Sequence, residues 1–213
     1  MPVATPEHPS IGRFVLATAA TIRLANWRPT GWSAAVGVAL LATSRPESLD
    51  LRLALSGGLV ASSCGFLLDD PAAATAEPMP TTLRTRRVQR ITLAAVPLGL
   101  WWTAALTLMT ARAGELPLTG RTLLFAALAT SALAASAIAT RQGDRNSGGV
   151  AGAVTALLVF ASTLLPDRTW LPLPPAPDAP DATLQLTLVL LATLTVLWFA
   201  SADPATGARL VKP

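Results

Sequence analysis

The sequence predicts an all-α integral membrane protein with six transmembrane helices, preceded by an amphipathic helix at the membrane surface. Of its 213 residues, 52% are hydrophobic and only 13% are charged, whereas soluble domains carry about 25% charged residues. The apolar residues gather in blocks, and the charged residues lie between the blocks. This number of charged residues is too small to cover the surface of a water-soluble fold. We therefore expect a lipid bilayer around the protein.

Residues 1–29 form an N-terminal region with a polar, Pro-rich tail and a segment with one apolar face. Within residues 10–27, Ile11, Phe14 and Ile22 share one side of a helical wheel. A helix with a single apolar face lies along the membrane surface. Alternatively, this segment dips into the bilayer and extends the first span.

Six apolar blocks follow, at residues 30–44, 53–68, 91–111, 122–140, 148–165 and 182–201. A transmembrane helix needs about 20 residues, with a range of roughly 17–25, so the last four blocks fit well. The first two are short. Either Arg45 and Arg52 extend their side chains to the far interface, or these two blocks form a shallow hairpin. The transmembrane domain covers residues 30–201, and residues 202–213 form a cytoplasmic tail.

Basic residues predict the orientation of these spans. With both termini in the cytoplasm, the cytoplasmic segments hold eleven of the sixteen basic residues. The outside segments hold Arg45, Arg52, Arg112, Arg121 and Arg168. Cytoplasmic loops of membrane proteins carry such an excess of basic residues. Abundant Ala and Arg with a single Lys is typical of a GC-rich bacterium, so we expect a bacterial plasma membrane.

Small residues recur every four positions in three of the predicted spans, which lets helices approach closely. These faces are Gly57, Ala61 and Gly65; Ala127, Ser131, Ala135 and Ala139; and Gly148, Gly152 and Ala156.

Residues for catalysis, cofactor binding or metal binding are scarce. The single histidine (His8) and the single cysteine (Cys64) offer no basis for a disulfide or a zinc site. The arginines lie at the ends of apolar blocks rather than in one basic stripe, which argues against nucleic acid. No charged residue lies in the middle of a span, which argues against proton-coupled transport. We therefore expect no catalytic, cofactor or metal site.

Asp69 and Asp70 lie at the cytoplasmic end of the second predicted span. Paired carboxylates can hold magnesium and a diphosphate, so a prenyl or diphosphate-transfer enzyme is one alternative. That chemistry needs further Asp residues at DDxxD spacing and a second motif, and the sequence has neither. We expect the two carboxylates to end a helix and to pair with nearby arginines.

The longest predicted cytoplasmic loop, residues 69–90, ends in a basic segment. Residues 81–90 (TTLRTRRVQR) predict a short helix that Thr81 can cap. Its candidate docking residues are Leu83, Arg84, Arg86, Arg87 and Arg90. Two interpretations stay open here: the arginines anchor the loop to anionic lipid, or the helix docks a soluble partner.

This arrangement resembles the permease (membrane) subunits of ABC transporters of the type-2, exporter-like class. The resemblance rests on the surface helix at 10–28, the six spans and the basic helix at 81–90, which matches the coupling helix of that family. The family also carries short re-entrant elements where this chain has residues 166–181. The resemblance implies a cytoplasmic ATPase subunit as partner, with ATP hydrolysis in that subunit and not in this chain. It also implies a second copy or a sister permease chain, and an amphipathic or lipid-like substrate. A membrane anchor or accessory subunit without a transport path is the alternative.

Overall fold

The computed structural model describes residues 25–45, 48–69, 83–113, 118–141, 147–163 and 182–201, except for the side chains of residues 83–87, 113 and 163. All regular structure in these ranges is helical, so the predicted all-α fold is confirmed for them. Most of the predicted surface helix at 10–27, the outer loop at 166–181, the tail at 202–213 and Asp70 lie outside these ranges.

The described ranges hold six α-helices, and each one covers one of the six predicted apolar blocks. Their bounds are α2 Trp27–Ala42, α3 Leu49–Cys64, α4 Leu83–Ala113, α5 Leu118–Arg141, α6 Ser147–Thr163 and α7 Ala182–Ser201. A short 3-10 helix, η2 (Gly65–Leu67), continues α3.

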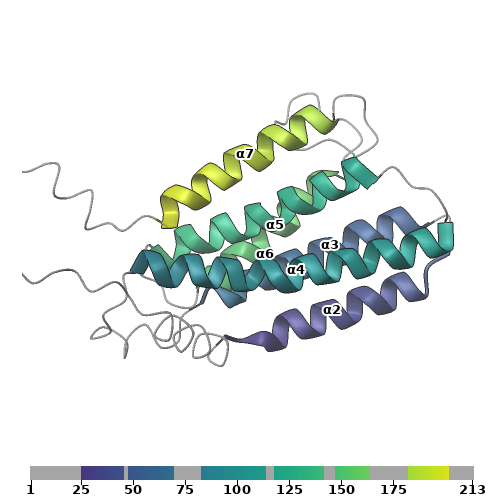
Figure 1. Ribbon diagram of the computed structural model, residues 1–213, viewed down its shortest axis with the longest axis horizontal. Coiled ribbons are helices and arrows are strands. Elements are labelled where there is room, and N and C mark those ends of the chain that lie inside the picture. Colours follow the sequence, from purple (N-terminus) through teal and green to yellow (C-terminus); the bar gives the residue numbers. More distant parts are fainter. Residues whose placement is uncertain are drawn as a thin grey trace, which may run out of the picture.

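The helices run alternately up and down in one elongated bundle, with α2 and α7 at opposite edges (Figure 1). One end of the bundle holds the N-termini of α2, α4 and α6 and the C-termini of η2, α5 and α7. We call it the Trp27 end, and we call the opposite end the Arg45 end. Helix α5 packs against α6 and α7, while α3 packs against α2, α5 and α6.

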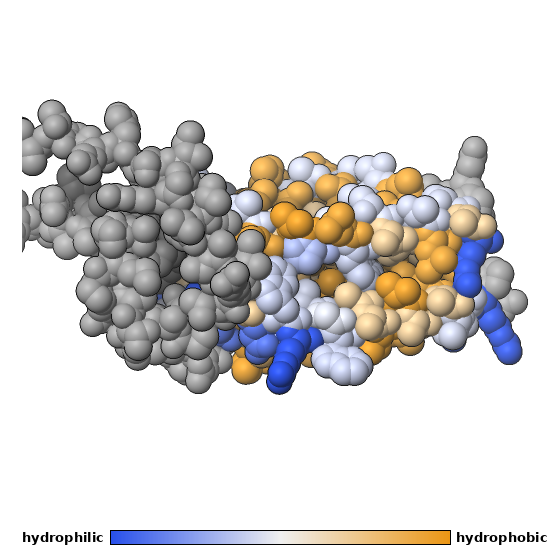
Figure 2. All heavy atoms as spheres, turned by 60° about the horizontal axis from the view of Figure 1, so that its bottom comes forward, coloured by the Kyte–Doolittle hydropathy of each residue, from blue (hydrophilic) through white to orange (hydrophobic). Residues whose placement is uncertain are grey.

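Large apolar side chains cover the outside of this bundle as well as its core. The most exposed are Trp32, Leu100, Leu158, Leu184, Trp198 and Phe199. A water-soluble helix carries polar residues on its outward face, and large exposed apolar patches mark contact with a protein or a membrane. In Figure 2, apolar residues are spread over the middle of the visible face, and strongly hydrophilic residues lie toward the ends of the coloured part.

Serine and threonine fit into these apolar helices because their hydroxyls bond to the helix itself. Thr107 donates to the Thr103 carbonyl at 2.8 Å, Thr187 to Thr183 at 2.6 Å and Ser201 to Leu197 at 2.7 Å. Such back-bonding to the preceding turn satisfies the hydroxyl without a partner outside the helix. These polar residues are therefore compatible with an apolar surrounding.

Three of the helices are long and apolar enough to cross a membrane: Val88–Arg112, Leu118–Arg141 and Ala182–Ser201. The segment Ser147–Ser162 is apolar but shorter. Helices α2 and α3 have 16 residues each, which corresponds to about 24 Å at the α-helical rise. The fold is therefore an all-helical bundle with three candidate membrane-spanning helices.

Candidate functional site

The basic segment predicted to dock a partner forms the start of α4. This helix begins at Leu83 and runs without interruption to Ala113 over 31 residues. Arg84, Arg86 and Arg87 thus lie in its first two turns. The separate short helix expected over residues 81–90 is absent from the described part of the chain, because residues 83–90 belong to the long helix that includes the third apolar block.

The side chain of Arg90, the last of the predicted docking residues, points into the bundle. It is only 7% exposed, and its Nη1 donates to the carbonyls of Leu68, at 3.4 Å, and Asp69. The last carbonyls of a helix have no partner within the helix and attract cations. Arg90 therefore caps the end of η2, and it is not on the surface that this chain offers to a partner.

Asp69 also links two helices, because its carboxylate lies at the N-terminus of α6. The Gly149 N–H donates to both carboxylate oxygens at N···O distances of 3.1 Å. Helix α6 has no acidic residue in its own first turn, and a carboxylate at this position stabilises free N–H groups and the helix dipole. Asp69 thus lies at a helix end, as predicted, and the structure assigns it the further role of capping another helix.

Two glycines make this cap possible. A Cβ on Gly148 would lie 2.5 Å from Asp69 Oδ1, and a Cβ on Gly149 would lie 2.2 Å from the Phe66 ring. Any larger residue would push Asp69 or Phe66 away from the start of α6.

Among the described residues, no group of three or more His, Cys, Asp or Glu side chains could hold a metal ion.

Small residues bring α6 against α5 and η2 next to this cap. The predicted face of α6 is buried at Gly148, Gly152 and Ala156. A Cβ on Gly152 would lie 2.3 Å from Ser136 Oγ and 2.9 Å from the Ala132 carbonyl. Helix α5 thus meets α6 through Ala132 and Ser136, which lie beside the row of small residues that the sequence predicted for it.

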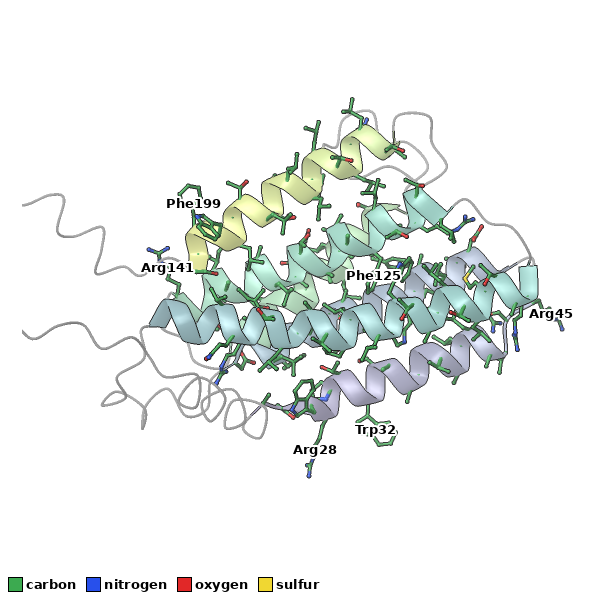
Figure 3. All side chains as sticks on the ribbon, in the orientation of Figure 1. Arg28, Trp32, Arg45, Phe125, Arg141 and Phe199 are labelled. Atoms are coloured by element: carbon green, nitrogen blue, oxygen red, sulfur yellow. The ribbon has the colours of Figure 1, made fainter. Side chains whose placement is uncertain are left out.

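Other arginines join neighbouring helices at both ends of the bundle. At the Arg45 end, Arg112 of α4 donates to the Leu41 carbonyl at 3.0 Å, and Arg52 of α3 donates to the Leu40 carbonyl at 3.3 Å. Both therefore cap the C-terminus of α2. At the Trp27 end, Arg141 of α5 donates to the Phe199 carbonyl of α7 at 3.0 Å (Figure 3).

One ion pair strengthens the Arg45 end. Arg121 binds Asp50 through two nitrogens, with Nε···Oδ1 at 3.0 Å and Nη2···Oδ2 at 2.8 Å. This bidentate geometry suits a guanidinium and a carboxylate. The Asp50 side chain is 65% exposed, so the pair contributes at most about 1 kcal/mol to stability.

Aromatic side chains fill the space between α2, α3, α4 and α5. Trp102 stacks on Phe125 with ring centroids 4.4 Å apart, and Trp101 lies 5.7 Å from Phe125. Figure 3 shows Phe125 inside the bundle. Gly37 of α2 lets this helix approach Trp101, because a Cβ there would lie 3.0 Å from the indole ring. Apart from the Trp101-Trp102 pair itself, no sequence pattern indicates this cluster.

No family model, no curated protein and no solved structure matches this chain. The structure alone therefore defines its class: in the described residues, an all-helical bundle with three candidate membrane-spanning helices. Arginines and Asp69 join the ends of neighbouring helices in this bundle.

Proposed function

We propose that this chain is the permease subunit of an ABC-type exporter, with six transmembrane helices and a separate ATPase that docks at the Trp27 end. The observation that carries this proposal is the continuity of α4 from Leu83 to Ala113. One rigid helix joins the basic turns at its start to the apolar segment Val88–Arg112. A force applied to those turns would therefore reach the middle of the bundle.

The spacing of arginines along the long helices supports the membrane placement. Arg121 and Arg141 lie 20 positions apart in α5, or about 30 Å along the helix axis. Arg90 and Arg112 lie 22 positions apart in α4, or about 33 Å. The hydrocarbon core of a bilayer is about 30 Å thick, so the arginines of both helices lie at its two boundaries.

The short helices α2 and α3 also cross the bilayer in this proposal. They lie beside α4 and α5 in the bundle, and Arg28 and Arg45 lie toward opposite ends of α2 (Figure 3). Long arginine side chains reach the interface from a helix that is too short for the bilayer. The basic residues are more numerous at the Trp27 end, which supports its placement in the cytoplasm together with both termini.

Docking is the role we assign to Leu83, Arg84, Arg86 and Arg87. Guanidinium groups form bidentate pairs with carboxylates on a protein surface. Anionic lipid would also attract these arginines, with about 1 kcal/mol for each one near the membrane surface. Lipid anchoring depends only on charge, whereas docking depends also on the shape of the helix.

The distribution of apolar and charged side chains supports our proposal for the substrate class. Large apolar side chains face outward on α2, α4, α6 and α7, and charged side chains of the described residues lie near the helix ends. We therefore propose an amphipathic or lipid-like substrate, such as a peptide or a secondary metabolite. It would pass between this chain and a second copy or a sister chain.

A non-transporting accessory subunit is the second candidate, and the filled centre of the bundle favours it. Trp101, Trp102 and Phe125 occupy one half, and the close contacts of Gly65, Ser136 and Gly152 occupy the other. A subunit packed in this way would anchor a complex without providing a path.

Prolines placed at two positions of α4 test the docking proposal at unchanged charge. Val88→Pro should abolish co-purification of the candidate ATPase subunit, together with its stimulated ATP turnover. A proline there removes the hydrogen bond to the Arg84 carbonyl and clashes with that turn, which separates the basic turns from the span. Thr85→Pro is the matched control, because Thr85 is the third residue of α4 and is not a docking residue. Proline is tolerated in the first turn of a helix, where the backbone N–H has no partner within the helix.

Equal retention and turnover in both proline variants would contradict docking through α4. Loss of membrane expression after removal of the arginine charges, with the ATPase still bound to Val88→Pro, would favour lipid anchoring. ATPase binding without any substrate export in proteoliposomes would favour the accessory subunit.

A further inference from the structure

We infer that Asp69 and Arg90 form a joint that makes the Trp27 ends of α3, α4 and α6 move as one body. The existence of this joint rests on contacts within the chain alone. Its use, which is to pass a displacement of α4 to α3 and α6, rests on the proposed function.

Arg90 provides the link between α4 and η2. It lies in the third turn of α4, directly after the basic turns, and its guanidinium reaches two carbonyls at the end of η2. Arg90 is only 7% exposed, and a buried guanidinium is stable only when such acceptors surround it. A shift of α4 along its axis would have to leave this charge without acceptors or take the end of η2 with it.

Asp69 extends the link from η2 to α6. Its backbone carbonyl accepts from Arg90, and its carboxylate accepts from the Gly149 N–H. One residue thus bonds to α4 through its main chain and to α6 through its side chain. The close approach of Gly148 to Asp69 Oδ1 leaves the carboxylate little room to move without α6.

A joint at the Trp27 end matters for α4 because much of the surface of this helix does not pack against the bundle. Only 28% of the most apolar segment of α4 is buried inside the bundle, compared with 61% of the corresponding segment of α5. Between helices in lipid there is little hydrophobic driving force, and association depends on close packing and hydrogen bonds. On the side of α4 that carries Gly99, no described residue lies within 4 Å of a Cβ placed there. The polar contacts at the two ends of α4 therefore add to the buried packing of Trp101, Trp102 and Met109 on its other side.

Distances between spin labels test the joint in the full chain in lipid nanodiscs. The labels go on Val88→Cys in α4 and Val150→Cys in α6, whose native side chains are 45% and 57% exposed. Cys64, which is buried, is replaced by alanine in all variants. We expect one narrow distance distribution in this background and a broadened or shifted one after Asp69→Asn or Arg90→Gln.

Conservative variants separate positioning from general loss of stability. Arg90→Lys keeps the charge and should restore part of the narrow distribution, whereas Asp50→Asn removes a carboxylate at the opposite end and should leave the distribution unchanged. If Asp69→Asn does not fold, Arg90→Gln and Arg90→Lys still decide the question. An unchanged distribution in the folded Asp69 and Arg90 variants would overturn the joint.

The ATPase gives a separate result for the use of the joint. We expect Asp69→Asn to retain the ATPase, because the docking turns are intact, and to lose the stimulation of ATP turnover. Full stimulation in that variant would overturn the role in transmission. The Cys64→Ala chain could bind no ATPase while Asp69→Asn still broadens the distribution of spin-label distances. This result would contradict the proposed function and support the joint.

Discussion

Trp101→Ala should lower the free energy of unfolding by about 3 kcal/mol, at the lower end of the range for tryptophan truncations in protein cores. Trp101 is 6% exposed and contacts Trp102, Phe125 and the backbone at Gly37. Its loss leaves a cavity between four helices. We expect a loss at the lower end of that range because burying a side chain between helices in lipid gains little transfer free energy. Denaturation with sodium dodecyl sulfate in detergent micelles, followed by circular dichroism, measures the change.

Trp32→Ala is the matched control for this truncation. Trp32 is 73% exposed and points away from the bundle (Figure 3), so its truncation leaves no cavity. Trp101→Phe should cost much less than Trp101→Ala, because phenylalanine keeps most of the buried ring and removes the indole N–H. No described residue accepts a hydrogen bond from this N–H, and an unpaired buried donor costs about 1–3 kcal/mol. Equal destabilisation by Trp101→Ala and Trp32→Ala would show that the aromatic cluster does not support the bundle.

Gly152→Ala should destabilise the bundle by about 1–3 kcal/mol, the usual cost of overpacking. A Cβ at this position would lie 2.3 Å from Ser136 Oγ, 2.9 Å from the Ala132 carbonyl and 3.3 Å from Gly65 Cα. Ser136 would have to rotate and lose its 2.7 Å hydrogen bond to the Gly148 carbonyl. The same denaturation experiment measures this effect.

Gly99→Ala separates this steric effect from helix propensity. A Cβ on Gly99 would have no neighbour within 4 Å, so alanine there should stabilise α4 by up to about 1 kcal/mol. Ser136→Ala combined with Gly152→Ala should cost less than the sum of the single changes, because it removes the nearest clashing atom. Similar effects of Gly152→Ala and Gly99→Ala would contradict the close packing of α5 and α6.

Most of the fold could be predicted from the sequence, because apolar blocks between charged residues are sufficient to locate helices. Each of the six blocks overlaps one α-helix, and α7 has the predicted bounds. The apolar block 91–111 predicts a helix that begins too late, since α4 begins at Leu83. Arg84, Arg86 and Arg87 are good helix formers, and the hydropathy pattern contains no signal that separates them from the span.

The joints between helices could not be predicted, because they depend on which helix ends meet in space. The basic residues were interpreted as membrane flanks, whereas Arg52, Arg90, Arg112 and Arg141 each donate to a carbonyl at the C-terminal end of another helical segment. Asp69 was expected at a helix end, but its contact with Gly149 lies 80 positions away along the chain. Glycine pairs such as Gly148-Gly149 are the one local signal that another element approaches closely.

Cysteine accessibility in whole cells tests the six-span membrane placement most directly. Single cysteines replace Arg45, Thr85 or Trp170 in a Cys64→Ala background, and a membrane-impermeant maleimide is added before or after permeabilisation. We predict labelling of positions 45 and 170 from outside, and labelling of position 85 only after permeabilisation. Labelling of position 85 in intact cells, or protection of position 45 until permeabilisation, would contradict the placement of α2 and α3 as full spans with the Trp27 end in the cytoplasm.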